Sequence, residues 1–146
     1  MGKLSKYVPY ITISNNDIPL DPVTLTDAGT WYPLTSTKLI TRYSNKMSNL
    51  NGVITHEGQN WISEFKGTAD VSVDKACNIC FELRKDGVPL LGVISDKDYA
   101  SASKIGVLAK VHHVELVNGS NYQVYAKSSV ALTEITVSTM SLVFGG

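Results

Sequence analysis

The cysteines and histidines are the residues whose types could support redox or metal chemistry. Cys77 and Cys80 have the C-x-x-C spacing that redox dithiols place at a helix N-terminus. Here the motif lies in an alternating β pattern, so the two side chains point to opposite faces with Cα atoms roughly 10 Å apart. A disulfide requires less than about 7 Å, and we therefore interpret both cysteines as packing residues. His56, His112 and His113 supply no second ligand pair at zinc-finger spacing, so the sequence predicts no metal site.

The carboxylates form no catalytic or calcium-binding pattern. Asp96 and Asp98 flank a lysine, without the glycine-centred loop and bidentate glutamate of a calcium loop. The glutamates are scattered and fall mostly on the predicted wet faces of strands: Glu57, Glu64, Glu82, Glu115 and Glu134. The sequence has no nucleophile elbow, phosphate loop or zinc-protease motif. It therefore predicts no catalytic residue and no cofactor, and the chain is not expected to be an enzyme.

Composition narrows the class of protein further. The 146 residues include 13 Lys+Arg and 13 Asp+Glu, and the formal net charge is zero. Proteins that bind nucleic acid or an anionic membrane carry a clear excess of basic residues, so neither partner is expected for this chain. Charged residues make up 18% of the chain, below the roughly 25% of an average soluble domain. A neutral, charge-poor surface gives little protection against association, which favours a protein that assembles.

The elements that position these residues read as strands. Residues 61–73 alternate between apolar and polar side chains, as a half-buried strand does. The next strand, 77–84, ends at Asp86-Gly87, which is typical of a type I′ hairpin turn. Pro89 indicates that the returning strand lies at a sheet edge. Further strands over 105–116, 122–127 and 132–144, with loops over 96–103 and 128–131, predict an all-β antiparallel sandwich.

The first part of the chain differs from the rest in composition. Four of the chain's five prolines lie within the first 33 residues, and a short strand is expected over 10–14. We therefore predict an extended N-terminal arm with short strands over residues 1–50, followed by the sandwich domain over 51–146. Two interpretations stay open: the arm packs on its own domain, or it docks on another subunit or protein.

The order of these segments resembles a known family. The resemblance rests on these motifs: GVITHEG (52–58), ADVSV (69–73), the KDG hairpin (85–87), the run VELVNGSNY ending at Tyr122, and the Thr-rich last strand. Over about residues 50–146 they resemble the trimeric jelly-roll modules, similar to tumour necrosis factor and C1q heads, that tailed bacteriophages carry as head fibres, capsid decoration proteins and fibre tips. Ser120 and Asn121 stand where an acidic residue is common in that family, and residues 30–34 only faintly echo its preceding strand.

The resemblance implies a homotrimer located on the virion surface. Strands that carry apolar groups on both faces are candidates for its interface: Phe81, Tyr122, Val124, Tyr125, Met140, Leu142 and Phe144. The implied function is a non-enzymatic capsid decoration, cement or head-fibre protein attached through its arm, with candidate docking residues Tyr7, Tyr10, Ile11, Ile13, Trp31 and Tyr32. The alternative is a receptor-binding tip that recognises a host glycan or protein through Asp96, Asp98 and Tyr99. One histidine per subunit could also hold a metal on the threefold axis.

Overall fold

The computed structural model describes residues 8–145, apart from the side chains of residues 91–93 and His112. Over this range the regular structure consists of strands. They are β1 (Tyr10–Ser14), β2 (Val23–Leu25), β3 (Tyr32–Pro33), β4 (Ile40–Asn45), β5 (Met47–Leu50), β6 (Val53–His56), β7 (Trp61–Val73), β8 (Cys77–Lys85), β9 (Val88–Tyr99), β10 (Ser103–Leu116), β11 (Asn121–Ser128) and β12 (Thr133–Gly145). The described part contains no helix long and apolar enough to cross a membrane.

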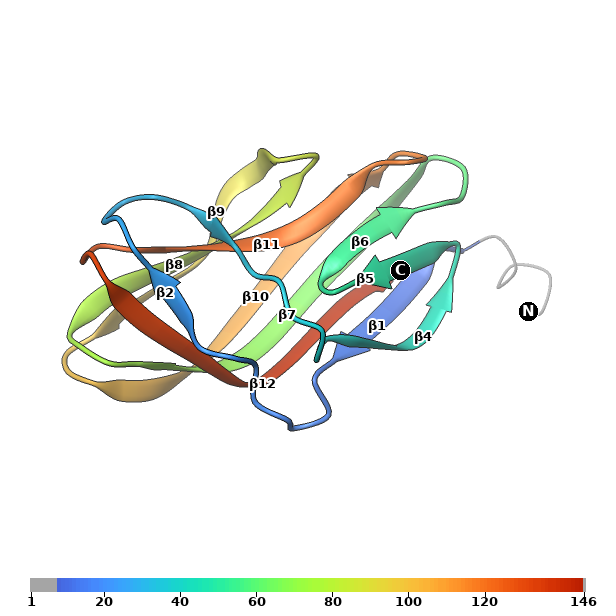
Figure 1. Ribbon diagram of the computed structural model, residues 1–146. Helices are drawn as coiled ribbons and strands as arrows, with labels where there is room; N and C mark the ends of the chain where they lie inside the picture. Colours follow the sequence, from blue (N-terminus) through green and yellow to red (C-terminus); the bar gives the residue numbers. More distant parts are fainter. Residues whose placement is uncertain (1–7, 146) are drawn as a thin grey trace.

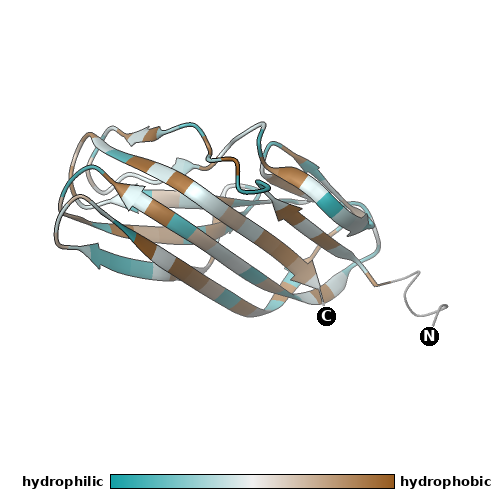
Figure 2. Cartoon of the chain, turned by 90° about the horizontal axis from the view of Figure 1, so that it is seen from below, coloured by the Kyte–Doolittle hydropathy of each residue, from teal (hydrophilic) through white to brown (hydrophobic). Residues whose placement is uncertain are grey.

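Two antiparallel sheets face each other (Figure 1). Sheet A has the order β10-β7-β12-β1-β4, with β2 paired to the start of β12. Sheet B has the order β5-β6-β11-β8-β9, with β3 paired to β11. Hydrophobic and hydrophilic residues alternate along the long strands (Figure 2), as expected for strands that bury one face only. The predicted all-β antiparallel sandwich is confirmed.

The core lies between the sheets and is centred on three aromatic rings. The rings of Phe65 and Phe144 have centroids 5.0 Å apart, and Tyr122 meets Phe144 edge-on at 5.6 Å. All three side chains are completely buried. Phe65 and Phe144 lie on strands of sheet A and Tyr122 lies on a strand of sheet B, so the cluster holds the two sheets together. Offset and edge-on aromatic pairs add roughly 0.5–1.5 kcal/mol each to the area that they bury.

A β-bulge in β12 changes which residues of the last strand face inward. Between Val137 and Thr139 the register against β7 shifts by one residue. Because side chains alternate with a period of two, one extra residue moves every later side chain to the opposite face. Ile135 and Val137 before the bulge and Met140, Leu142 and Phe144 after it are therefore all buried in the same core. The prediction that this strand is apolar on both faces is wrong.

Asn15 holds this bulge in place. Its side chain is buried, and its Nδ2 donates to the carbonyls of Ile18 (3.0 Å) and Ser138 (2.9 Å). Its Oδ1 accepts the N–H of Met140 at 3.1 Å. Both amide hydrogens and the amide oxygen of this buried side chain are thus bonded, and two of these bonds tie the end of β1 to the bulged part of β12.

Residues 8–50 do not form an arm separate from the sandwich. β1 lies between β12 and β4 in sheet A, and its residues Ile11 and Ile13 are completely buried. Leu20, Leu25 and Leu34 also belong to the core. The predicted boundary at residue 50 is therefore corrected for the described residues: of the two interpretations left open, packing on the chain's own domain is the one observed.

The hairpin and edge predictions for β8 and β9 are confirmed, and the loop prediction after them is not. Asp86 and Gly87 have φ angles of 51° and 81°, the positive values that a type I′ turn requires. β9 is an edge strand of sheet B, consistent with Pro89. β9 continues to Tyr99, so Asp96, Asp98 and Tyr99 lie on a strand and not in a loop.

Candidate functional site

The outer face of sheet A carries a row of uncharged side chains that crosses five strands. The register places Ile40, Ser14, Ser141, Thr68 and Leu108 side by side on β4, β1, β12, β7 and β10. The three hydroxyl residues in the middle are half-buried, and Leu108 at the far end is 63% exposed. The neighbouring row adds Tyr43, Thr12 and Val143 before charge appears at Lys66 and Lys110. An uncharged row of half-buried side chains with exposed apolar ends is typical of a surface that another protein covers.

A groove of about 260 Å³ lies on this face, next to the β12 bulge. Ser14, Asn16, Arg42, Thr139 and Ser141 are among its lining residues. An Arg42 Nη1–H donates to Oδ1 of Asn16, and Thr139 Oγ1 donates to Asp70 at 2.8 Å. Asn16 and Asp17 both have positive φ angles, 52° and 59°, so the turn that follows β1 is fixed in a conformation that asparagine and aspartate tolerate better than most residues.

The predicted interface residues do not lie on this outer face. Phe81, Tyr122 and Val124 point into the chain's own core, as do Met140, Leu142 and Phe144. A side chain that is buried within one chain is not free to contact another, so these six assignments are corrected. Tyr125 is the exception: it is half-buried on the outer face of sheet B.

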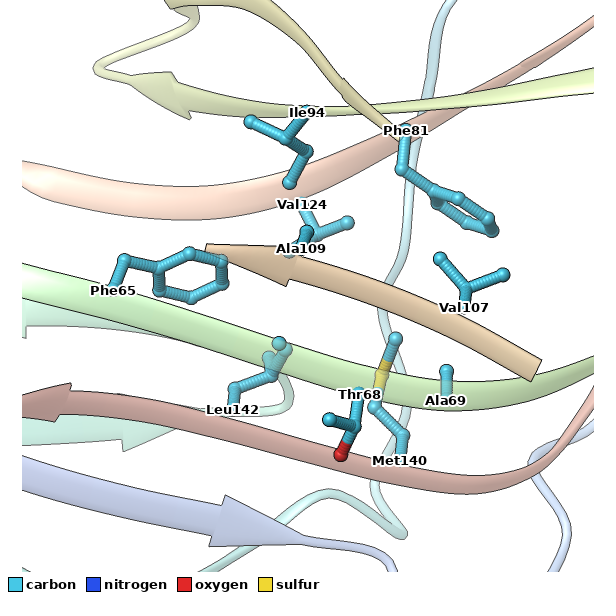
Figure 3. Close-up of a pocket in the computed structure, with 11 residues that line it drawn as sticks. Phe65, Thr68, Ala69, Phe81, Ile94, Val107, Ala109, Val124, Met140 and Leu142 are labelled. Carbon is cyan, nitrogen blue, oxygen red and sulfur yellow. The ribbon is translucent and has the colours of Figure 1, made fainter. Parts of the chain in front are cut away.

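A small cavity lies between the sheets among several of these core residues (Figure 3). Its volume is about 20 Å³, and Phe65, Phe81, Met140 and Leu142 are among the side chains that surround it. That space would hold about one water molecule, but a water needs two or more polar partners and this lining is almost wholly apolar. The cavity is therefore a packing defect and not a ligand site.

The outer face of sheet B, in contrast, is charged. Arg84 donates from Nε to Glu82 at 2.7 Å, and its guanidinium carbon lies 4.5 Å from the ring centre of Tyr125. Trp31 covers the same group, at 4.7 Å from Lys127 Nζ and 5.8 Å from the Arg84 guanidinium. The alternation of β8 predicts a wet Glu82, but Glu82 is almost fully buried under this stack.

The N-terminal docking candidates are divided by the structure. Trp31 lies over the outer face of sheet B, against Lys127, and Tyr32 belongs to β3 of that sheet, where it pairs with Ala126 of β11. Tyr10, in sheet A, is 39% exposed and remains available for contact. Ile11 and Ile13 are corrected because they are core residues, and Tyr7 lies outside the described residues.

The receptor-loop candidates occupy two environments. Asp96 and Asp98 are exposed on β9, and both accept from Nδ2 of Asn78, at 2.5 and 2.8 Å. Tyr99 is buried, and its hydroxyl donates to the carbonyl of Val71 at 3.1 Å, which ties β9 to sheet A. Tyr99 is therefore corrected from a receptor contact to a core residue.

The buried hydroxyl of Tyr99 predicts a loss of stability at high pH. Burial raises the pKa of Tyr99 from 10.0 to about 12. The phenol of the unfolded chain therefore ionises first, and the stability that Tyr99 contributes is complete below pH 10 and lost as the pH rises towards 12. The loss attributable to this group is roughly 2–3 kcal/mol.

Urea unfolding at a series of pH values measures this loss. Tyr99→Phe should flatten the alkaline fall in the free energy of unfolding by close to one proton, whereas Tyr43→Phe, at an exposed tyrosine, should leave it unchanged. Equal slopes for Tyr99→Phe and the unaltered chain would contradict the assignment.

The cysteines and histidines form no reactive centre among the side chains that the structure describes. Cys77 and Cys80 are free and buried, and burial is the main cause that raises the pKa of each thiol. A thiol with a raised pKa is a poor nucleophile. No group of three or more His, Cys, Asp and Glu side chains that could hold a metal occurs in the described part of the chain.

Comparisons with known proteins identify the fold. No family model matches the sequence, and no curated protein matches it. The solved structure of Eiger TNF from S. frugiperda matches with a TM-score of 0.66 at 8% identity, over 95% of this chain and 92% of that chain. The globular domain of zebrafish complement 1qA matches with a TM-score of 0.50 at 8% identity, over 92% and 94% of the two chains.

A further match is the PRD1 vertex protein P5, with a TM-score of 0.53 at 9% identity, over 94% of this chain and 72% of that chain. Together these similarities define the class of fold: the chain is a TNF- and C1q-like jelly roll, as the sequence resemblance implied. At such low identity they establish the fold alone.

Proposed function

We propose that this chain is a non-enzymatic structural protein of a virus particle, and that it self-associates as a homotrimer through the outer face of sheet A. The observation that carries the proposal is the uncharged row Ile40–Ser14–Ser141–Thr68–Leu108. An antiparallel sheet of a monomeric sandwich normally presents a wet, charged outer face. The outer face of sheet A departs from this along its middle row, and the charged Lys66 and Lys110 lie in the row beyond it.

The low charge of the whole chain supports the same assignment. A subunit that buries one sheet face in an assembly exposes less surface to water and needs fewer charges for solubility. The ion pair at the edge of the uncharged face, Lys110 with Glu64 at 4.0 Å, is half-exposed and contributes little to stability. We assign it to the rim of the proposed interface because both side chains are half-exposed.

The role on the particle is proposed to be capsid decoration, cement or head fibre, attached through the N-terminal end of the chain. The similarity to a PRD1 vertex protein supports a place on a virion. Tyr10 is the described residue that we assign to this attachment, since it is exposed at the start of β1. Trp31 and Tyr32 are half-buried at sheet B and stay candidates for the same attachment.

Immunogold electron microscopy of virus particles, with antibodies raised against the purified chain, tests this role. Gold over the particle shell is expected. Labelling confined to a tail tip would contradict decoration and favour the receptor-binding alternative, and the absence of label from intact and opened particles would contradict a virion role altogether.

A further inference from the structure

The outer face of sheet B carries a cluster of aromatic and charged side chains, on the opposite layer from the proposed interface row. The cluster lies over β11 and β8, which are neighbours in this sheet (Figure 1). The register pairs Tyr125 of β11 with Glu82 of β8, so these two side chains share the outer face. We name the following five residues the Trp31 cluster: Trp31, Glu82, Arg84, Tyr125 and Lys127.

The side chains of the Trp31 cluster are held by one another. Arg84 donates from Nε to the almost fully buried Glu82 at 2.7 Å, and its guanidinium carbon lies 4.5 Å from the ring centre of Tyr125. The ring centre of Trp31 lies 5.8 Å from the same guanidinium carbon and 4.7 Å from Nζ of Lys127. Because these side chains are already ordered, a partner that contacts them loses little of its binding energy to immobilising them.

The segment that carries Trp31 is also fixed at both ends. The N–H of Gly29 donates to the carbonyl of Ser128 at 2.8 Å, and the N–H of Leu34 donates to the carbonyl of Val124 at 2.9 Å. Both acceptors belong to β11, the strand that carries Tyr125 and Lys127. The position of the indole over these residues is therefore a feature of the fold.

The two cations of the cluster differ in how their charge is balanced. Arg84 is paired with Glu82, whereas none of the ion pairs among the described residues includes Lys127. The ammonium of Lys127 lies over the indole of Trp31 instead. Lys127 can therefore accept a carboxylate from a partner without the loss of an existing ion pair.

We propose that the Trp31 cluster binds an extended segment of a shell protein, and that this segment presents one carboxylate flanked by apolar side chains. The proposal rests on the proposed role on the particle and names the chemistry of its attachment. The carboxylate pairs with Lys127. The apolar side chains pack on the half-buried rings of Trp31 and Tyr125 and on the exposed Pro33, which is paired with Tyr125. Trp, Tyr and Arg are the residues on which the binding energy of protein interfaces most often depends.

The same face disfavours a polyanion such as a sulfated glycan or a nucleic acid. Asp96 and Asp98 are exposed on β9 of this sheet. The register places Asp96 and Lys127 on either side of Cys80, which is two strand spacings or roughly 10 Å across the face. A densely charged chain that crosses the face would meet these carboxylates, and like charges in proximity repel each other. A single carboxylate at Lys127 avoids them.

An array of short synthetic peptides tests this chemistry on the full chain. Each peptide has a central glutamate between varied apolar residues and is matched with two peptides in which glutamine or lysine replaces it. We expect the best glutamate peptides to bind at least about tenfold more tightly than their glutamine counterparts, because only the former place a charge at Lys127. The difference should shrink as salt is added. Fluorescence anisotropy in solution measures the affinities.

Four variants assign the binding to the cluster. Lys127→Met keeps an unbranched side chain beside the indole and should abolish the preference for glutamate, and Trp31→Ala should weaken all binding at least about tenfold. Lys127→Glu should reverse the preference towards the lysine peptides, a gain of binding that a misfolded chain cannot produce. Lys97→Met, at an exposed lysine on β9 of the same sheet, is the matched control and should bind as the unaltered chain does.

Three results would overturn the proposal. The first is that no glutamate peptide binds more tightly than its glutamine counterpart. The second is an unchanged preference in Lys127→Met or an unchanged affinity in Trp31→Ala. The third is tighter binding to heparin fragments than to every glutamate peptide, which would assign the cluster to an acidic glycan. None of these results bears on the location of the chain in a virus particle, which the immunogold labelling tests.

Discussion

Replacement of Phe144 by alanine is expected to lower the free energy of unfolding by about 3–5 kcal/mol. The side chain is completely buried and contacts the rings of Phe65 and Tyr122, so its loss leaves a cavity at the junction of the two sheets. Because a domain of this size has a total stability of roughly 5–15 kcal/mol, the variant should be close to unfolding. Urea denaturation followed by circular dichroism, at one fixed protein concentration, measures the change.

Leu50→Ala is the matched control for this large-to-small substitution. Leu50 is 72% exposed, and truncation there should change the free energy of unfolding by less than about 0.5 kcal/mol. A Phe144→Ala variant no less stable than Leu50→Ala would contradict the burial of the last strand after its bulge.

Ser141→Arg is expected to convert the assembly to monomers. Ser141 is the middle residue of the uncharged row, with Ser14 and Thr68 beside it and Arg42 lining the same groove. Each subunit would bury an unpaired cation, at a cost of at least about 3–5 kcal/mol, which corresponds to a loss of affinity of roughly a hundredfold or more. Size-exclusion chromatography with light scattering follows the change in mass.

Val88→Arg adds the same charge on a different surface. Val88 is 64% exposed at the β8–β9 hairpin, and this variant should keep the mass of the unaltered chain. Circular dichroism of Ser141→Arg should remain that of a folded β protein, since the side chain points away from the core. An unchanged mass in Ser141→Arg would exclude this face as the interface.

The sequence predicts the strands and the chemistry of the tight turns well, because both depend on near neighbours. The alternation over residues 61–73 corresponds to β7, and the Asp86-Gly87 pair gives the predicted turn.

The errors arise where one extra residue interrupts the alternation. The bulge between Val137 and Thr139 depends on Asn15, which is more than a hundred residues earlier in the chain. A second bulge in β10 sets His112 and His113 opposite the single residue Glu64. Neither interruption has a local signature, so a strand that buries one face is misread as apolar on both.

The candidate surfaces depend on register, which the sequence does not encode locally. Ile40, Ser14, Ser141, Thr68 and Leu108 are unremarkable one by one and become a continuous row only when five strands are aligned. The sequence indicates only one residue of this row locally: the alternation over residues 61–73 places Thr68 on the polar, outward face of that strand. The Trp31 cluster likewise needs the pairing of β11 with both β3 and β8.

The most direct test of the central claim is the mass of the unaltered full chain in solution by multi-angle light scattering. A homotrimer through the outer face of sheet A predicts three times the 15.8 kDa of one chain, maintained on dilution into the low micromolar range. A mass of 15.8 kDa at every concentration would contradict the claim.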